Sequence, residues 1–186
     1  MITSRELTTA RLRLVPCSDE HLEGLNVVNS DPEVMRYLTG RTETLADTRA
    51  MIERVKARWA RWGYSWWAFV ERQSGDIVGA GAIQNLRKAG DEPDPACPLE
   101  IGWRVRRDRW RRGLAGEASV AMAEFAFDRL GADTLYAVSH PDNRASIAVM
   151  VKLGMHYRGL EDWYAQPVAT YAVTAEAWRA ARRTGI

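Results

Sequence analysis

Arg109-Trp-Arg-Arg-Gly-Leu-Ala-Gly-Glu-Ala118 is the most informative segment of the sequence, because an extended apolar run passes there through a basic, glycine-containing turn into a long helix. The run 99–105 has the composition of a strand, and a helical pattern begins at Leu114. Backbone N–H groups in a first helical turn have no intrahelical partner and lie at the positive end of the helix dipole. The stretch therefore predicts a pyrophosphate site, with Gly113 allowing close approach of the backbone. The same pattern also fits an ordinary strand-to-helix turn with a solvated basic loop.

The spacing of residues around this turn resembles the acetyl-CoA loop of the GNAT superfamily of N-acetyltransferases. That loop reads Val-x-x-x-x-Gln/Arg-x-x-Gly-x-Gly/Ala. Here Val105 is followed by Trp110 at the Gln/Arg position and then by Gly113 and Ala115. The tryptophan is similar to that of the RimJ/RimL-like branch, whose members acetylate protein N-termini and small amines.

A second block of sequence, residues 141–155, carries the same resemblance. It contains Asn143, Ser146 and the ending Leu153-Gly-Met155. These residues resemble the Asn-x-x-Ser helix and the Leu-Gly-Met/Phe ending that follow the fifth strand in the RimJ/RimL-like branch. Because two separate blocks occur in the expected order, the chain is identified as a GNAT member over about residues 12–178.

The resemblance implies a GNAT fold of the α/β (α+β) class, with a mixed central β-sheet of about seven strands flanked by helices. Residue patterns along the chain agree with this class. Strands are expected at 11–16, 65–71, 77–86, 99–105, 134–139, 155–160 and 168–174. Helices are expected at 22–28, 33–38, 44–63, 114–130, 143–153 and 175–183, with an exposed loop at 87–98. The strand–helix–strand succession from 99 to 139 favours a parallel pair of strands.

Composition narrows the class of protein. A chain of 186 residues, 46% hydrophobic and 27% charged, predicts a single globular domain over residues 1–186. A net charge of +2 with dispersed arginines favours an acidic cofactor over a nucleic acid. Cys17 and Cys97 lie far apart without neighbours at metal-ligand spacing, so we expect neither a metal site nor a secreted disulfide framework. No signal peptide or membrane-spanning run is visible, and we expect a cytoplasmic protein without a membrane partner.

The resemblance implies acetyl-CoA as co-substrate and a direct transfer, in which an amine attacks the thioester within a ternary complex. It assigns to Val105 a backbone contact with the pantetheine arm of the cofactor. It assigns the pyrophosphate to a loop made of Arg111, Arg112, Gly113, Leu114, Ala115 and Gly116. Asn143 suits both an N-cap of its helix and a hydrogen bond to a pantetheine amide, and both roles stay open.

Two residues are candidates for the catalytic groups. Glu100 lies on the strand beside the cofactor loop, where some GNAT enzymes carry a glutamate base, although a solvent-facing strand carboxylate is the alternative. Glu161 and Asp162, expected in a loop after the sixth strand, are weaker candidates for the base. Many GNAT enzymes protonate the leaving thiolate with a tyrosine, whose position here is Met150. The RimL-like pattern suggests Ser146 as the substitute acid, with helix packing as its alternative role.

The leading hypothesis is an acetyl-CoA-dependent N-acetyltransferase that acts on a protein N-terminal amine or a small-molecule amine. The alternative is a catalytically inactive acyl-CoA-binding sensor or regulatory module, which the methionine at the acid position leaves open. Trp59 and Trp62 lie at helical spacing, which favours core packing over a role in the acceptor groove. Assembly into a homodimer through exposed tryptophans or a sheet edge is a further hypothesis.

Overall fold

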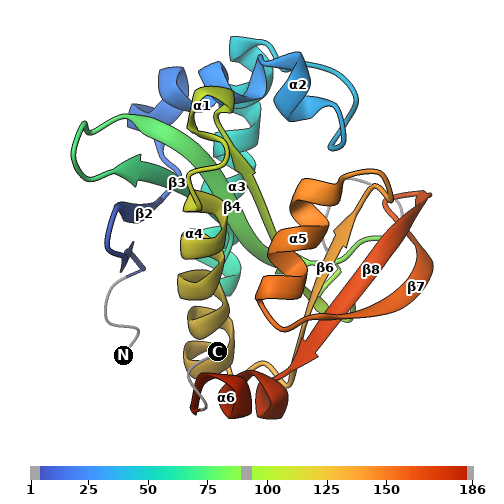
Figure 1. The fold of residues 1–186 in the computed structure, drawn as a ribbon. Helices are drawn as coiled ribbons and strands as arrows, with labels where there is room; N and C mark the ends of the chain where they lie inside the picture. The colour runs from blue at the N-terminus through green and yellow to red at the C-terminus, as the bar shows by residue number, and fades with distance from the viewer. Residues whose placement is uncertain (1–4, 89–93, 184–186) are drawn as a thin grey trace. The chain divides into compact units, whose positions relative to one another are not determined.

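The computed structural model describes residues 5–88 and 94–183 (Figure 1). The chain divides into two compact units. Unit 1 comprises Met1–Ala82 and Trp103–Ala121, and unit 2 comprises Ile83–Gly102 and Met122–Ile186. Three elements contribute residues to both units: β4 (Ile77–Asn85), β5 (Leu99–Val105) and α4 (Leu114–Glu124). The middle of the expected loop 87–98, residues 89–93, lies outside the described residues.

The strands of unit 1 are hydrogen-bonded in the order β1-β2-β3-β4-β5. Besides β4 and β5 they are β1 (Leu7–Thr8), β2 (Leu12–Pro16) and β3 (Trp66–Glu71). The pairs from β1 to β4 are antiparallel. Alternation in β2 buries Leu12 and Leu14 completely and exposes Arg13, so the half-buried strand expected at 11–16 is confirmed.

Three helices of unit 1 lie between β2 and β3. They are α1 (Leu22–Asn29), which follows a short turn of 3-10 helix at Asp19–His21, α2 (Pro32–Met35) and α3 (Leu45–Trp62). The side chain of Asp31 caps α2, and Thr44 and Asp47 form a capping box at the start of α3. The helix expected at 33–38 is shorter than predicted, because turns replace it after Met35.

Trp59, the first of the two tryptophans at helical spacing on α3, packs in the core as predicted. Trp59 is 3% exposed, and its ring lies edge-on to the ring of Trp67 with 4.9 Å between centroids. Its indole N–H donates to the carbonyl of Trp66 at 3.0 Å. Trp62 is half-buried and stacks on Tyr64.

The strands of unit 2 follow the order β4-β5-β6-β8-β7. The last three are β6 (Thr134–Ser139), β7 (His156–Trp163) and β8 (Gln166–Thr174). Glu100 of β5 pairs with Tyr136 of β6 in parallel, which confirms the expected parallel pair. β8 is antiparallel to both β6 and β7. The sheet thus combines one parallel pair with antiparallel pairs, as the mixed fold class requires.

Two helices of unit 2 contact this sheet, as their positions in Figure 1 illustrate. α5 (Arg144–Lys152) contacts β6, and α6 (Ala175–Arg183) contacts β8. The single helix expected at 114–130 is α4 followed by a π-helical turn at Phe125–Arg129. It ends before Gly131, whose φ of 67° marks the left-handed C-cap position.

Three expectations about the strands need correction. The described residues form eight strands instead of about seven, because the two-residue β1 is too short to carry a periodic signal. β7 and β8 extend beyond 155–160 and 168–174, since Tyr164 and Ala165 form a tight turn with φ of 57° and 58°. Turns of this kind usually contain Asn or Gly, so the hairpin was not apparent from sequence. Glu161 and Asp162 consequently lie within β7 and not in a loop.

No helix in the described residues has both the length and the apolar character needed to cross a membrane.

Gly79 is packed too closely to carry a side chain. An added Cβ would lie 2.4 Å from the carbonyl oxygen of Arg104 on β5. The close approach of β5 explains why glycine stands at this position.

We expect Gly79→Val to lower the free energy of unfolding by about 2–3 kcal/mol, because the backbone it meets cannot move aside without breaking the β4–β5 pair. Urea unfolding measures the change. Gly102→Ala is the matched control, since a Cβ there meets nothing within 4 Å. Equal stability of the two variants would contradict the packing argument.

Candidate active site

The strand-to-helix turn of unit 1 has the backbone form of an anion-binding loop. β5 ends at Val105, a short 3-10 turn spans Arg107–Arg109, and α4 begins at Leu114. Two positions between them have left-handed backbone, Arg111 with φ of 61° and Gly113 with φ of 77°. This left-handed backbone turns the chain just before the first-turn amides of α4, which have no intrahelical partner. The residues expected to hold a pyrophosphate therefore lie together, as the strand-to-helix pattern predicts.

Charge around this turn is unevenly compensated. Asp108 pairs with Arg106 at 2.7 Å and with Arg109 at 2.6 Å. Arg111 and Arg112 are exposed, and their side chains form no ion pair with any residue that the structure describes. The two arginines nearest the loop's amides are thus available to an anion.

Trp110 ties the loop to the end of β5. Its indole N–H donates to the carbonyl of Val105 at 2.7 Å, while the side chain remains 43% exposed. The loop accommodates tryptophan at the Gln/Arg position because the indole hydrogen-bonds the end of β5 and so fixes the loop to that strand.

A clamp that sequence reasoning missed holds the loop from the N-terminal strands. Glu117, in the first turn of α4, accepts from the hydroxyl of Thr9 at 2.5 Å and from the backbone N–H of Arg11 at 2.7 Å. The Arg11 side chain donates to Glu117 at 2.7 Å and to the carbonyl of Arg112 at 2.7 Å. Burial raises the pKa of Glu117, but these hydrogen bonds outweigh it and the pKa is lowered overall.

Unit 2 buries the carboxyl of Glu100. The residue is 5% exposed, so the alternative of a solvent-facing carboxylate is wrong. The Tyr164 hydroxyl donates to Glu100 Oε2, and the Gln84 amide donates to the same oxygen at 3.0 Å. Gln84 also donates to the Tyr164 hydroxyl at 3.1 Å, which closes a three-membered network.

Burial in this network raises the affinity of Glu100 for a proton. Burial raises the pKa of Glu100, and the hydrogen bonds from Tyr164 and Gln84 oppose that rise only in part. Burial and the neighbouring Glu100 charge raise the pKa of Tyr164, so its hydroxyl remains a donor. The guanidinium of Arg87 lies 4.9 Å from the centroid of the Tyr164 ring and stabilises its position.

The β7–β8 turn places Tyr164 in this network. The backbone N–H of Tyr164 donates to the carbonyl of Arg87 at 2.7 Å, and that of Ala165 donates to Lys88 at 2.8 Å. Lys88 also lies 3.8 Å from the centroid of the Trp163 ring. The sequence around Tyr164 carries no signal for this contact, because the contact depends on the hairpin between β7 and β8.

The weaker base candidates have structural roles or lie in the open. Glu161 accepts from the indole of Trp163 at 3.0 Å and from Arg158 at 3.3 Å. Asp162 is exposed on β7.

The start of α5 holds the remaining candidates. Asn143 accepts from the backbone N–H of Ser146 at 3.2 Å and so caps the helix as expected. Ser146 is half-buried, and Met150 is 2% exposed at the position of the usual tyrosine acid.

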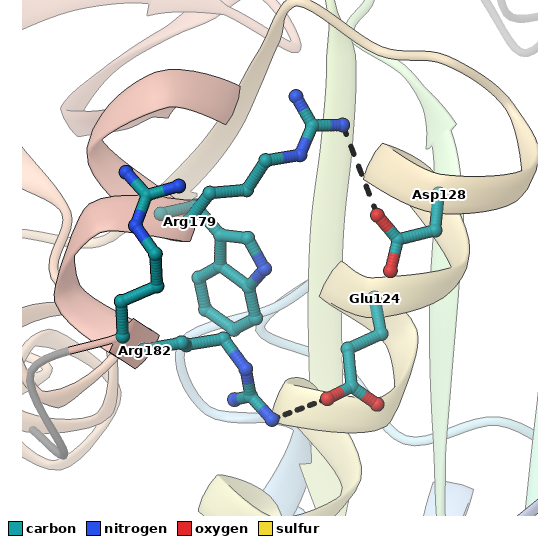
Figure 2. Close-up of a pocket in the computed structure, with 6 residues that line it drawn as sticks. Glu124, Asp128, Arg179 and Arg182 are labelled. Atoms are coloured by element: carbon teal, nitrogen blue, oxygen red, sulfur yellow. Dashed lines mark hydrogen bonds and ion pairs between the residues drawn. The ribbon is translucent and has the colours of Figure 1, made fainter.

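A separate hollow lies between α4 and α6 (Figure 2). Arg182 pairs there with Glu124, and Arg179 lies 3.8 Å from Asp128, beside Trp178. None of the site residues expected from sequence lines it. Three arginines and two carboxylates line the hollow, and it contains none of the residues of the two groups described above.

The family assignment follows from comparison with known proteins. Residues 11–156 match the family model described as an acetyltransferase (GNAT) domain. The chain therefore belongs to the GNAT family and is an N-acetyltransferase, and proteins of this family use acetyl-CoA.

Individual relatives agree with this assignment. The chain is 29% identical to the uncharacterized protein YkkB of Bacillus subtilis (strain 168), over 92% of this chain and 96% of the relative. It is 27% identical to the FsC-acetyl coenzyme A-N(2)-transacetylase of Aspergillus fumigatus, over 92% and 77% of the two chains. The solved structure of RimL, a ribosomal L7/L12 alpha-N-protein acetyltransferase in complex with coenzyme A, shares the fold with a TM-score of 0.75. That match covers 93% of this chain and 99% of the other, at 16% identity.

We expect Glu117→Gln to lower the free energy of unfolding by about 1–2 kcal/mol at pH 7, because a neutral amide accepts more weakly from Arg11 and disturbs the Thr9 contact. The lowered pKa of Glu117 gives this contribution a definite sign with pH. It is fully present above the unfolded value near ~4.3 and is lost as the pH falls through the folded value.

Urea unfolding of the wild type and of Glu117→Gln between pH 3 and 7 tests this expectation. The difference between their free energies of unfolding should shrink as the pH falls. A difference that stays constant or grows toward pH 3 would show that ionised Glu117 does not stabilise the loop.

Proposed function

We propose that this protein transfers an acetyl group from acetyl-CoA to a primary amine by direct attack within a ternary complex, with Glu100 as general base. The observation that carries the proposal is the buried carboxyl of Glu100, held by Tyr164 and Gln84. A base works best when its pKa lies near the working pH, and burial moves a carboxyl in that direction. A carboxylate kept only for fold stability would gain little from a site that disfavours its charge.

In the proposed acetyl transfer, the amine nitrogen forms a bond to the acetyl carbon and the bond from that carbon to sulfur breaks. The amine proton passes to Glu100 directly or through water. Coenzyme A leaves as a thiolate and takes up a proton. With a thiol pKa near ~8.5 this departure needs only modest help, and Ser146 is the proposed donor.

The turn after β5 is the proposed binding site for the pyrophosphate. The left-handed positions Arg111 and Gly113, the first-turn amides from Leu114 to Gly116, and the arginine side chains at 111 and 112 support it. Val105 and Asn143 are the proposed contacts of the pantetheine arm. The Trp110 indole already occupies the Val105 carbonyl, so a pantetheine contact there would share that oxygen or use the N–H.

The proposed acceptor is a protein N-terminal amine or a small-molecule amine, within the RimJ/RimL-like branch. Support comes from Trp110 and the Asn143-x-x-Ser146 pattern, and from relatives named for N(2) and alpha-N-protein acetylation. An α-amine with a pKa near ~8 needs less help from a base than a lysine near ~10.4.

Gly113→Trp should weaken acetyl-CoA binding by at least ~100-fold. An indole at this left-handed position would strain the loop and cover the first-turn amides of α4. Calorimetry on the full chain measures the affinity. Gly40→Trp is the matched control, since Gly40 has φ of 71°, lies in open space and is not part of the turn after β5.

Micromolar binding by the wild type and the control, with loss in Gly113→Trp, is the expected result. Equal binding by all three proteins would show that the pyrophosphate lies elsewhere. Binding without turnover on any primary amine would contradict the proposed transfer.

Glu100→Gln should lower kcat about 10²-fold, because the amide accepts no proton.

In the wild type, kcat/KM should rise with pH through the pKa of Glu100. Tyr164→Phe removes a hydrogen bond that lowers that pKa, so the acidic limb should move to higher pH while the plateau changes less. An acidic limb that stays in place, or moves to lower pH, would contradict the coupling of Tyr164 to the base.

A further inference from the structure

Arg104 is a buried cation without a conventional partner. Its side chain lies in unit 1 and is 9% exposed, and its Nε has no hydrogen-bond acceptor. Within residues 5–88 and 94–183 its guanidinium forms neither an ion pair nor a hydrogen bond. It lies 4.7 Å from the centroid of the Trp66 ring, and burial lowers its pKa. A buried charge with only an aromatic neighbour destabilises the fold, so a different role must account for it.

The groups around Arg104 leave its charge largely uncompensated. Glu43 acts on it electrostatically, but the Glu43 carboxylate accepts from Asn29 at 2.9 Å and lies beyond ion-pair distance of Arg104. Cys17 is buried, and burial raises the pKa of its thiol to about 12, so the thiol is neutral. Arg104 therefore keeps its positive charge, and the neighbouring negative charge of Glu43 is bound by Asn29.

We propose that Arg104 binds a carboxylate of the acceptor, so that the preferred substrates are amines that carry a free carboxyl group. A guanidinium presents a planar fork that matches a carboxylate, and an aromatic ring under it fixes its plane. A doubly charged phosphate would be repelled more strongly by Glu43 than a singly charged carboxylate. The assignment of the carboxylate to the acceptor rests on the proposed function.

The first test measures binding without turnover. Propionate and propionamide are the probes, each titrated into the full chain at constant ionic strength while the melting temperature is followed. We expect propionate to raise the Tm of the wild type and propionamide to leave it unchanged. Arg104→Met should abolish the propionate effect, and Glu43→Gln should enlarge it, because a repelling charge is removed.

The stability of the unliganded variant separates binding from structure. If Arg104 serves a ligand, Arg104→Met removes an unpaired buried charge and should melt at or above the wild type, by up to about 4 °C. If Arg104 serves the fold through Trp66, the variant should melt several degrees lower.

The second test compares acceptors in matched pairs, each amine with a free carboxyl and as its carboxamide. The wild type should show a KM about tenfold or more lower for the carboxyl form, and the ratio should approach one in Arg104→Met. Acetylation of both forms with equal KM, without a propionate effect, would overturn this site and leave the proposed function intact. A propionate effect lost in Arg104→Met, without acetylation of any amine, would overturn the proposed function and leave the site standing.

Discussion

A buried carboxyl group needs donors, and the one on Glu100 has two. The hydroxyl of Tyr164 and the amide of Gln84 converge on a single carboxylate oxygen, while burial keeps the pKa of the acid raised. This arrangement requires the tight turn between β7 and β8, because only the turn brings Tyr164 to β5. The backbone bonds from Tyr164 and Ala165 to Arg87 and Lys88 hold that turn in place. The hairpin of unit 2 is thus the support of the proposed base.

In unit 1, the turn after β5 is the proposed binding site for an anion. The turn after β5 exposes amides and two unpaired arginines, which would be unfavourable if the loop were free to collapse onto its own carbonyls. Glu117 and Arg11 prevent this from outside the turn, and Trp110 prevents it from within. Arg104 is a cation of another kind, buried and paired with no acid. Among the described residues, Arg111 and Arg112 are exposed without an ion-pair partner and Arg104 is buried without one, which is more typical of binding sites than of a core.

Sequence patterns predicted the elements well where the signal is local. The cap at Asn143 and the range of β5 are confirmed, because each depends on residues a few positions apart. The loop from Arg111 to Gly116 was predictable for the same reason. The partners of Glu100 were not, since Tyr164 lies 64 positions away and Gln84 lies 16 away. The Arg11–Glu117 clamp spans 106 positions, and the sheet alone brings these residues together. Resemblance to a family pointed to Glu100, but burial of its carboxyl had no sequence signal.

If Glu100 is the proposed base, burial must raise the pKa of its carboxyl. A carbon-13 NMR titration of glutamate-labelled protein measures this pKa, with Glu100→Gln used to assign the side-chain carboxyl resonance. We expect the resonance to titrate clearly above the ordinary value of 4.5, as a single transition that is absent from the variant. Titration at or below 4.5 would contradict the proposed role, because an acid of that strength would be an ordinary structural carboxylate.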